Sequence, residues 1–398
     1  MDFSVPTLIG DKIMKIQVLI YIVGYSLLYF LLSTSLYFLS VNSGYNGLSL
    51  PIFGGGDDGQ FYYEQAMKFA NGEPYIYTSM HVLVLGVILD IFNTDNVLIL
   101  RCFNFISNIL ILVLSLLILK KISKDKTFHI SATLLVLFLA FYPSLLLNST
   151  LSIYRDSWIY AFFLWATYLF INIFISKGKW PKVINLVLLM FVLIMLGGYR
   201  KYALLSFVIG AMIYLFIKLI SKKKVSLFKI GGLLFIGVSV FYILFRNFKF
   251  PVVGLSFSDV LQYRQANLEA GGSQMGISLD HSNILLFYAN YLYSVLSNFI
   301  GPFPWQITGG STLILMVTEG IIFFFISIYL VKKMKYFSKV ELFLLIQAIV
   351  WFLLISISND NFGTGSRLRI VGWLPLIIIF VKYYSEGIYR RKLRKLNS

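Results

Sequence analysis

Long apolar runs separated by short polar segments dominate the pattern of this chain. A helix that crosses a bilayer needs about 20 predominantly apolar residues, and ten segments approach that length. We predict spans near residues 16–40, 97–119, 129–148, 157–176, 183–198, 202–220, 230–246, 312–331, 340–357 and 369–385. The pattern therefore predicts an all-α polytopic membrane protein in which residues 1–398 form a single integral membrane domain.

Two further apolar segments do not fit a full crossing. Residues 79–92 are short and run into a polar stretch, DIFNTDN, without a basic flank. Residues 283–300 carry three Asn and three Tyr among their apolar side chains. Amphipathic segments of this kind lie in the interface plane or enter the membrane only partly. We predict interfacial or re-entrant helices on the outer side at both places.

The basic residues are distributed unevenly, and their distribution predicts the topology. The formal net charge is +17, and most Lys and Arg residues fall in alternate connections and in the C-terminal tail. The positive-inside rule assigns such segments to the cytoplasm. We therefore predict a multi-pass protein of the plasma or inner membrane with both termini cytoplasmic. The two long loops, residues 41–96 and 247–311, then face outward.

Composition excludes several function classes. Hydrophobic residues make up 58% of the chain and charged residues 13%, whereas soluble domains carry about a quarter charged residues. No soluble basic domain is predicted, so we expect no nucleic-acid partner. The single cysteine, Cys102, excludes an intramolecular disulfide and a Cys-rich metal site. Function is expected in the long outer loops, because unstructured loops of such length are usually functional.

The first outer loop contains two adjacent carboxylates in the stretch GGGDDGQFYYEQAMKFANGEP, residues 54–74. The spacing predicts a helix over residues 59–70, with Tyr62 on its apolar face. Asp57 precedes this helix with a Gln three residues later, which resembles a capping box. Asp58 has no predicted structural role and is the candidate functional carboxylate. An acid pair can also hold Mg²⁺ or Mn²⁺, so a divalent cation is a possible cofactor.

This layout resembles the GT-C class of membrane glycosyltransferases, which includes protein mannosyltransferases and lipid A aminoarabinose transferases. The resemblance covers roughly residues 16–200. It rests on the loop acid, the Tyr-rich helix, an Asn-Gly-x-Pro segment and a second interfacial helix. In place of the proline pair of protein mannosyltransferases, this chain has Ser-Met-His at residues 79–81. The later segments YRD, YRKY, PFPW and GTGSRLR resemble bacterial GT-C-like proteins or polymerases of surface polysaccharide.

The resemblance implies a GT-C-like fold and an extracytoplasmic transfer reaction. The donor is then a sugar linked to polyprenyl (undecaprenyl) phosphate, and the acceptor is a glycan or a lipid. Asp58, with Asp57 beside it, is implied as the catalytic base. A lipid-linked donor needs no nucleotide-binding domain, and the chain has no phosphate-binding loop or dinucleotide fingerprint.

Transfer from a phosphate also needs cations that stabilise the leaving group. The candidate substrate-binding residues are Tyr62, Arg155, Asp156, Arg200, Lys201, Arg264, Trp305, Arg367 and Arg369. Arg200 and Lys201 lie in a very short outer turn, where the positive-inside rule disfavours cations. Arg367 and Arg369 follow a Gly-rich segment that predicts a turn before the last span.

Plainer roles remain open for several of these residues. The arginines at the outer surface could contact ordinary lipid phosphate. Asp156 could cap a helix or pair with Arg155, and Trp305 could be an interfacial anchor. Glu319 lies within a predicted span and could pair with one of the outer arginines.

Two other functions compete with glycosyl transfer. An oligosaccharide repeat-unit polymerase would act on undecaprenyl-diphosphate-linked substrates and rely mainly on outer arginines. A flippase or transporter for lipid-linked sugars is the third alternative, although such proteins favour internal repeats and none is evident here.

Overall fold

The computed structural model describes residues 7–48, 50, 58–220, 247–249, 254, 256–268, 273–279 and 283–397. Every regular element within these ranges is helical. The α-helices are α1 (Thr7–Asn42), α2 (Asp58–Ala70), α3 (Met80–Phe92), α4 (Val97–Ile122), α5 (Asp125–Ala140), α6 (Pro143–Thr150), α7 (Asp156–Ile175), α8 (Lys179–Tyr199), α9 (Lys201–Ile220), α11 (Phe257–Leu268), α12 (Ile284–Ile300), α13 (Gly310–Leu315), α14 (Ile321–Lys333), α15 (Lys339–Ser358) and α16 (Phe362–Asn397). Short turns η3 (Pro304–Gln306), η4 (Met316–Gly320) and η5 (Met334–Tyr336) join some of them.

The chain is a multi-pass helical membrane protein. Eight helices of the described part are long and apolar enough to cross a membrane, if the run Gly310–Tyr336, which comprises α13, η4, α14 and η5, is counted as one. The number is nine if the bent pair α5 and α6 is also one span. Each predicted span coincides with one of these helices or with the bent pair, except the span near 230–246. That segment lies outside the described residues. The number of crossings therefore stays a prediction.

The span predicted over residues 129–148 differs from the structure, because it is broken. Helices α5 and α6 meet at an angle of 59°. Pro143 is the first residue of α6, and a proline ring disfavours helical backbone at the residue before it. The far end of α6 is held by Arg101 of α4, whose buried guanidinium donates to the carbonyl oxygens of Thr150 and Leu151, each at 2.7 Å.

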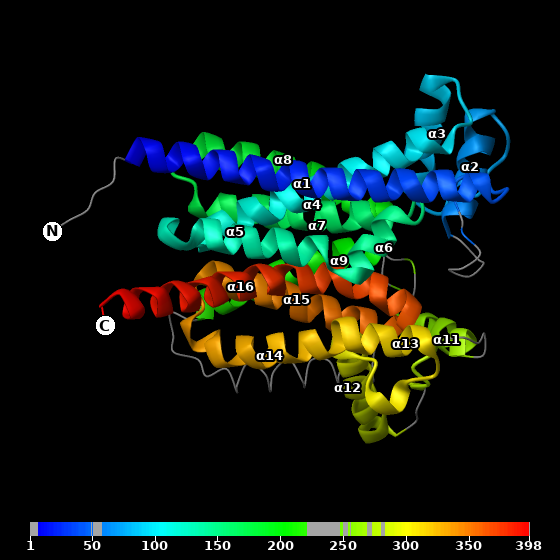
Figure 1. Ribbon diagram of the computed structural model, residues 1–398. Helices are drawn as coiled ribbons and strands as arrows, with labels where there is room; N and C mark the ends of the chain where they lie inside the picture. The colour runs from blue at the N-terminus through cyan, green and yellow to red at the C-terminus, as the bar shows by residue number, and fades with distance from the viewer. Residues whose placement is uncertain are drawn as a thin grey trace. The chain divides into compact units, whose positions relative to one another are not determined.

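The helices group into two compact units. The first unit comprises Met1–Arg200 with Leu374–Ser398, and the second comprises Lys201–Trp373. The last helix, α16, contributes residues to both. In the first unit α1, α4, α7 and α8 run side by side, and α2 and α3 lie at one end of these long helices (Figure 1).

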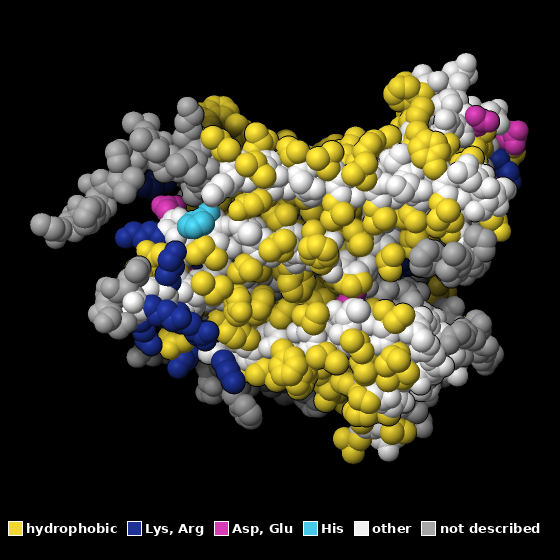
Figure 2. Space-filling model, in the orientation of Figure 1, with side chains coloured by type: hydrophobic (Ala, Val, Ile, Leu, Met, Phe, Trp, Pro, Cys, Tyr) yellow, Lys and Arg dark blue, Asp and Glu magenta, His cyan; other side chains and the backbone are white. Residues whose placement is uncertain are grey.

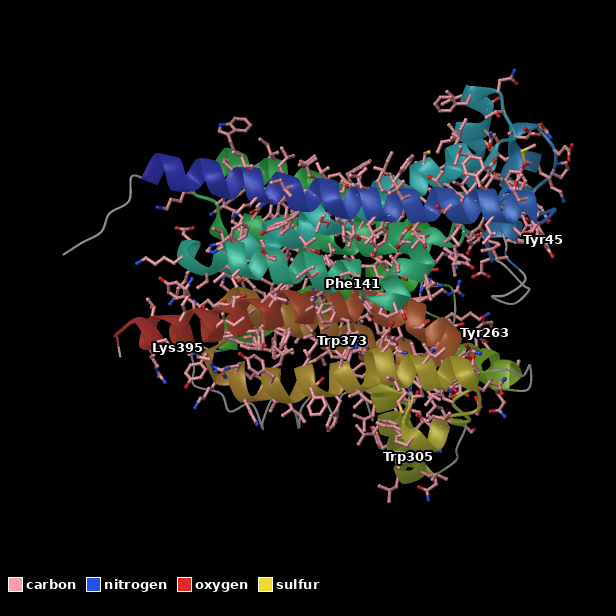
Figure 3. All side chains as sticks on the ribbon, in the orientation of Figure 1. Tyr45, Phe141, Tyr263, Trp305, Trp373 and Lys395 are labelled. Carbon is pink, nitrogen blue, oxygen red and sulfur yellow. The ribbon has the colours of Figure 1, made fainter. Side chains whose placement is uncertain are left out.

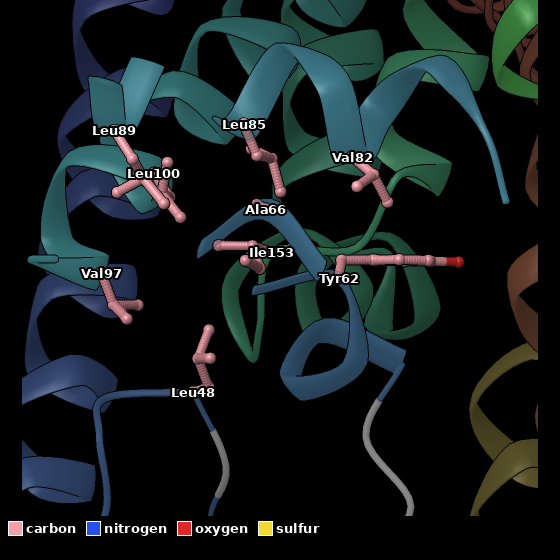
Figure 4. Packing of buried hydrophobic residues seen from close by; sticks show 9 residues of the cluster. All are labelled: Leu48, Tyr62, Ala66, Val82, Leu85, Leu89, Val97, Leu100 and Ile153. Atoms are coloured by element: carbon pink, nitrogen blue, oxygen red, sulfur yellow. The ribbon is translucent and has the colours of Figure 1, made fainter. Parts of the chain in front are cut away.

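The short helices α2 and α3 pack tightly on each other in the first unit. A side chain at Gly86 would collide with the ring of Phe69 and would lie 3.0 Å from the carbonyl oxygen of Ala66. Buried apolar residues of both helices join the segment after α1, helix α4 and the loop before α7 in one cluster: Leu48, Tyr62, Ala66, Val82, Leu85, Leu89, Val97, Leu100 and Ile153 (Figure 4). This packing fixes α2 and α3 on the end of α4.

In the second unit, α11 and α12 pack against α15. The interfacial segments predicted at 79–92 and 283–300 are helices α3 and α12; their position in the membrane interface stays a prediction. The turn predicted at GTGSRLR is wrong, because α16 begins at Phe362 and includes these residues. Asn361 caps the helix by accepting a hydrogen bond from the backbone N–H of Thr364 at 3.0 Å.

Candidate functional site

Charged side chains from three separate segments gather around Tyr62 in the first unit. Asp58 and Tyr62 come from α2, Arg155 and Asp156 from the start of α7, and Arg200 from the end of α8. Four of the charged candidates predicted from sequence therefore lie within electrostatic reach of a fifth candidate, Tyr62. Figure 4 shows the hydroxyl of Tyr62 pointing out of the apolar cluster that holds its ring.

Asp58 is the first residue of α2 and is partly exposed. The predicted helix 59–70 is confirmed, but it begins one residue earlier than expected. A carboxylate in the first turn is stabilised by the helix dipole, so Asp58 has a structural role that the sequence pattern did not predict. Its partner in the predicted acid pair, Asp57, lies outside the described residues.

Asp156 pairs with Arg200. The Arg200 guanidinium donates to the Asp156 carboxylate at 2.8 Å, and only 5% of the Asp156 side chain is exposed. Asp156 is the first residue of α7 and Arg200 is the residue directly after α8. The ion pair therefore joins the start of α7 to the end of α8, which is a different arrangement from the local pair with Arg155.

Arg155 lies on the ring of Tyr62. Its guanidinium carbon is 5.6 Å from the ring centroid, within the range of a cation–π interaction. Burial raises the pKa of Tyr62 to about 12, with Arg155 and Arg200 opposing the rise and Asp156 and Asp58 adding to it. Tyr62 is therefore a neutral hydrogen-bonding hydroxyl near neutral pH, placed among two cations and two carboxylates.

His81 was not a candidate in the sequence, yet it contacts this group directly. It has no exposed surface, and its ring lies 5.4 Å from those of Tyr62 and Tyr199, centroid to centroid. Its Nε2 lies 2.9 Å from the carbonyl oxygen of Ile153, two residues before Arg155. His81 also lies four residues before Leu85, and this helical spacing could have predicted its burial.

Arg264, by contrast, is buried in the second unit, where groups of the protein itself accept its hydrogen bonds. Its side chain is 1% exposed. It donates to the carbonyl oxygens of Ile277, Ser356 and Asn359 and to the carboxylate of Asp360. Arg264 lies on α11 and connects this helix to residue Ile277 and to the C-terminal end of α15.

Arg369 is also buried in the second unit. It donates to the carbonyl oxygen of Gly301 at 2.7 Å, and its Nε lies 3.8 Å from the carboxylate of Glu319. Glu319 was expected to pair with one of the arginines that are predicted to face outward, and that arginine is Arg369. Arg367 is only partly buried. Because these residues are helical, they do not form the predicted phosphate-binding turn.

The remaining two candidates are surface residues of the second unit. Trp305 is 72% exposed at the tip of the loop after α12 (Figure 3). Its ring stacks on Phe303 at 5.1 Å between centroids, and its indole N–H donates to the hydroxyl of Tyr293. Lys201 is exposed at the start of α9.

No cation site is defined by the described side chains, among which no three His, Cys, Asp or Glu residues lie close enough together to hold a metal ion. Whether Asp57 and Asp58 share a divalent cation stays a prediction. No family model, no curated protein and no solved structure matches this chain.

Proposed function

We propose that this protein is an integral membrane glycosyltransferase of the GT-C type. It moves a sugar from a polyprenyl-phosphate-linked donor to a glycan or lipid acceptor on the extracytoplasmic face of the cell membrane, in the assembly of surface glycans. The observation that carries the proposal is the gathering of Asp58, Arg155, Asp156 and Arg200 around Tyr62.

The chemistry assigns a role to each of these groups. The acceptor hydroxyl oxygen attacks the anomeric carbon of the sugar, and the Asp58 carboxylate takes the hydroxyl proton. The bond between the anomeric carbon and the phosphate oxygen breaks, and polyprenyl phosphate leaves with the electron pair. Arg155 and Arg200 stabilise the negative charge that develops on the phosphate.

Asp156 and Tyr62 position these reacting groups. Asp156 is buried and paired with Arg200, so it orients the guanidinium without competing for the acceptor proton. The neutral hydroxyl of Tyr62 is available to donate a hydrogen bond to the sugar or the phosphate, while its ring holds Arg155.

A repeat-unit polymerase acting on undecaprenyl-diphosphate oligosaccharides is the alternative. That reaction depends mainly on arginines that bind a diphosphate. Arg264 and Arg369 direct their hydrogen bonds to carbonyl and carboxylate groups of the protein, which gives this alternative less support. The lipid that copurifies distinguishes the two reactions by mass spectrometry: a monophosphate with one sugar supports the transferase, and a diphosphate with an oligosaccharide supports the polymerase.

The decisive test replaces Asp58 with Asn, which keeps the shape of the side chain and removes the base. We expect transfer from an undecaprenyl-phosphate-linked hexose by the purified protein to fall by about 10²–10⁴-fold, with donor binding unchanged. Glu64→Gln is the matched control, since it removes an exposed carboxylate from the same helix. Arg155→Gln is the contrasting variant. It should weaken donor binding by about 1.5–3 kcal/mol, because a phosphate loses a charge-assisted partner.

Turnover by Asp58→Asn at the parent rate would show that Asp58 is not the base. Equal losses in Asp57→Asn and Asp58→Asn, restored together by added Mg²⁺ or Mn²⁺, would instead indicate a shared cation. Unchanged donor binding in Arg155→Gln would show that Arg155 contacts Tyr62 but does not bind the donor phosphate.

A further inference from the structure

An apolar crevice opens at the opposite end of the long helices of the first unit. It has a volume of about 240 Å³ and lies where α1, α4 and α5 meet. Val18 and Ile22 of α1, Val113, Leu116 and Leu117 of α4, and Phe128 of α5 form its walls. Lys120 of α4 also lines it and brings a positive charge to an otherwise apolar surface.

The surroundings of Lys120 are strongly basic. Lys121, Lys124 and Lys126 follow within six residues, at the end of α4 and the start of α5, with Asp125 as the carboxylate among them. Figure 2 shows Lys and Arg side chains near the start of α5 and towards the C-terminal end of α16, both in the first unit. Lys121 does not line the crevice; its ammonium lies 5.9 Å from the ring centroid of Tyr168. Lys120 is thus the lysine whose side chain lines the crevice together with the apolar residues.

We infer that this crevice is a binding site for one anionic glycerophospholipid. An acyl chain fills the space between α1, α4 and α5, and the phosphate of the headgroup contacts the Lys120 ammonium. The complementarity of charge carries the assignment, because Lys120 adds an ammonium to walls that are otherwise apolar, and a phosphate headgroup above an acyl chain matches that combination. The positive-inside rule places this basic end in the cytoplasmic leaflet, where anionic lipids attract Lys and Arg.

The lipid at this site is not the proposed sugar donor. Val97, at the other end of α4, belongs to the apolar cluster of Tyr62. An α-helix rises 1.5 Å per residue, so Lys120 lies about 35 Å along α4 from Val97. A phosphate at Lys120 is therefore separated from Asp58 by roughly the thickness of the bilayer core. The site is independent of the proposed reaction.

The test is lipid binding to the delipidated full-length protein, measured by native mass spectrometry with added phosphatidylglycerol or phosphatidylcholine. We expect the parent to prefer phosphatidylglycerol. Lys120→Gln should bind phosphatidylglycerol about fivefold more weakly and phosphatidylcholine as before, whereas Lys121→Gln removes the same charge one residue away and should behave as the parent. Val18→Trp should fill the crevice and reduce binding of both lipids. Leu19→Trp, on the exposed side of α1, should not.

Each variant is first shown to keep the elution volume and melting temperature of the parent. Equal affinities in the Lys120 and Lys121 variants, or in the Val18 and Leu19 variants, would identify the crevice as ordinary lipid-facing surface. Equal binding of both lipids by the parent would overturn the preference for an anion. Displacement of phosphatidylglycerol by an equimolar amount of undecaprenyl phosphate would assign the site to the polyprenyl carrier instead.

Discussion

At the residue scale, His81 connects the candidate site to the protein core. Its ring lies between those of Tyr62 and Tyr199, and its contact with the carbonyl of Ile153 holds the segment that leads to Arg155. A buried imidazole with this one polar contact is favoured in its neutral form. Burial lowers the pKa of His81 from its usual 6.5 to about 4.

This depressed pKa predicts a pH dependence of stability. The unfolded chain binds a proton at His81 below about pH 6.5, but the folded chain does so only below about pH 4. The stabilisation is therefore fully present above pH 6.5 and is lost as the pH falls to 4, by about 3 kcal/mol. We expect the melting temperature of His81→Gln to depend less on pH over this range than that of the parent, since Gln does not titrate and keeps an N–H donor.

Thermal unfolding of the purified protein from pH 7 to pH 4 measures this slope. His129→Gln is the control, because His129 is exposed and should leave the parent slope intact. A slope that persists in His81→Gln, or that disappears in His129→Gln, would contradict the assignment to His81.

The residues of the candidate site were only partly predictable from sequence. Arg155, Asp156 and Arg200 were identifiable because charged residues at the ends of predicted spans stand out against their apolar surroundings. The pairing of Asp156 with Arg200 was not, since it depends on how α7 and α8 approach each other. Arg264 lies within the long loop 247–311, and its carbonyl partners come from segments that no local pattern relates to it.

At the scale of elements, the contact between α2 and α3 determines where Asp58 stands. Gly86 permits this contact, because a Cβ there would meet the ring of Phe69 and the carbonyl oxygen of Ala66. An aromatic ring can rotate away, but a helix carbonyl cannot. The position of α2 on α3 is therefore sensitive to one methyl group.

Gly86→Ala should destabilise the protein by about 1–3 kcal/mol, the usual cost of an extra methyl group in a well-packed interface. It should also lower transfer activity, because α2 carries the proposed base. Gly24→Ala on α1 is the matched control; a Cβ there meets nothing within 4 Å, and the change should be neutral or favourable by up to about 1 kcal/mol. Thermal unfolding compares the two, and equal effects would show that the contact at Gly86 tolerates expansion.

The limits of elements were less predictable than their existence. Helix α16 begins seven residues before the span predicted at 369–385, because glycines and two arginines concealed its first turns. The break between α5 and α6 had a local signal in Pro143. A hydropathy window averages across such a residue, so the pattern predicted one continuous span.

At the scale of the whole molecule, the charge pattern predicts which loops face outward. Cysteines introduced in a Cys102→Ser background test this with a maleimide that does not cross the membrane; Cys102 itself is exposed and must be removed. We expect labelling of intact cells at Lys68→Cys, and at Lys124→Cys and Lys395→Cys only after permeabilisation. All three replaced side chains are exposed. Labelling of Lys124→Cys in intact cells would mean that α3 crosses the bilayer.

Helix α16 has a consequence for how the protein is made. The first unit consists of residues 1–200 and residues 374–398, so its final helix leaves the ribosome only after the whole second unit has been synthesised. The site around Tyr62 therefore belongs to a unit that stays incomplete throughout most of translation. Residues 374–398 can pack against the earlier helices of the first unit only after residues 201–373 have been synthesised.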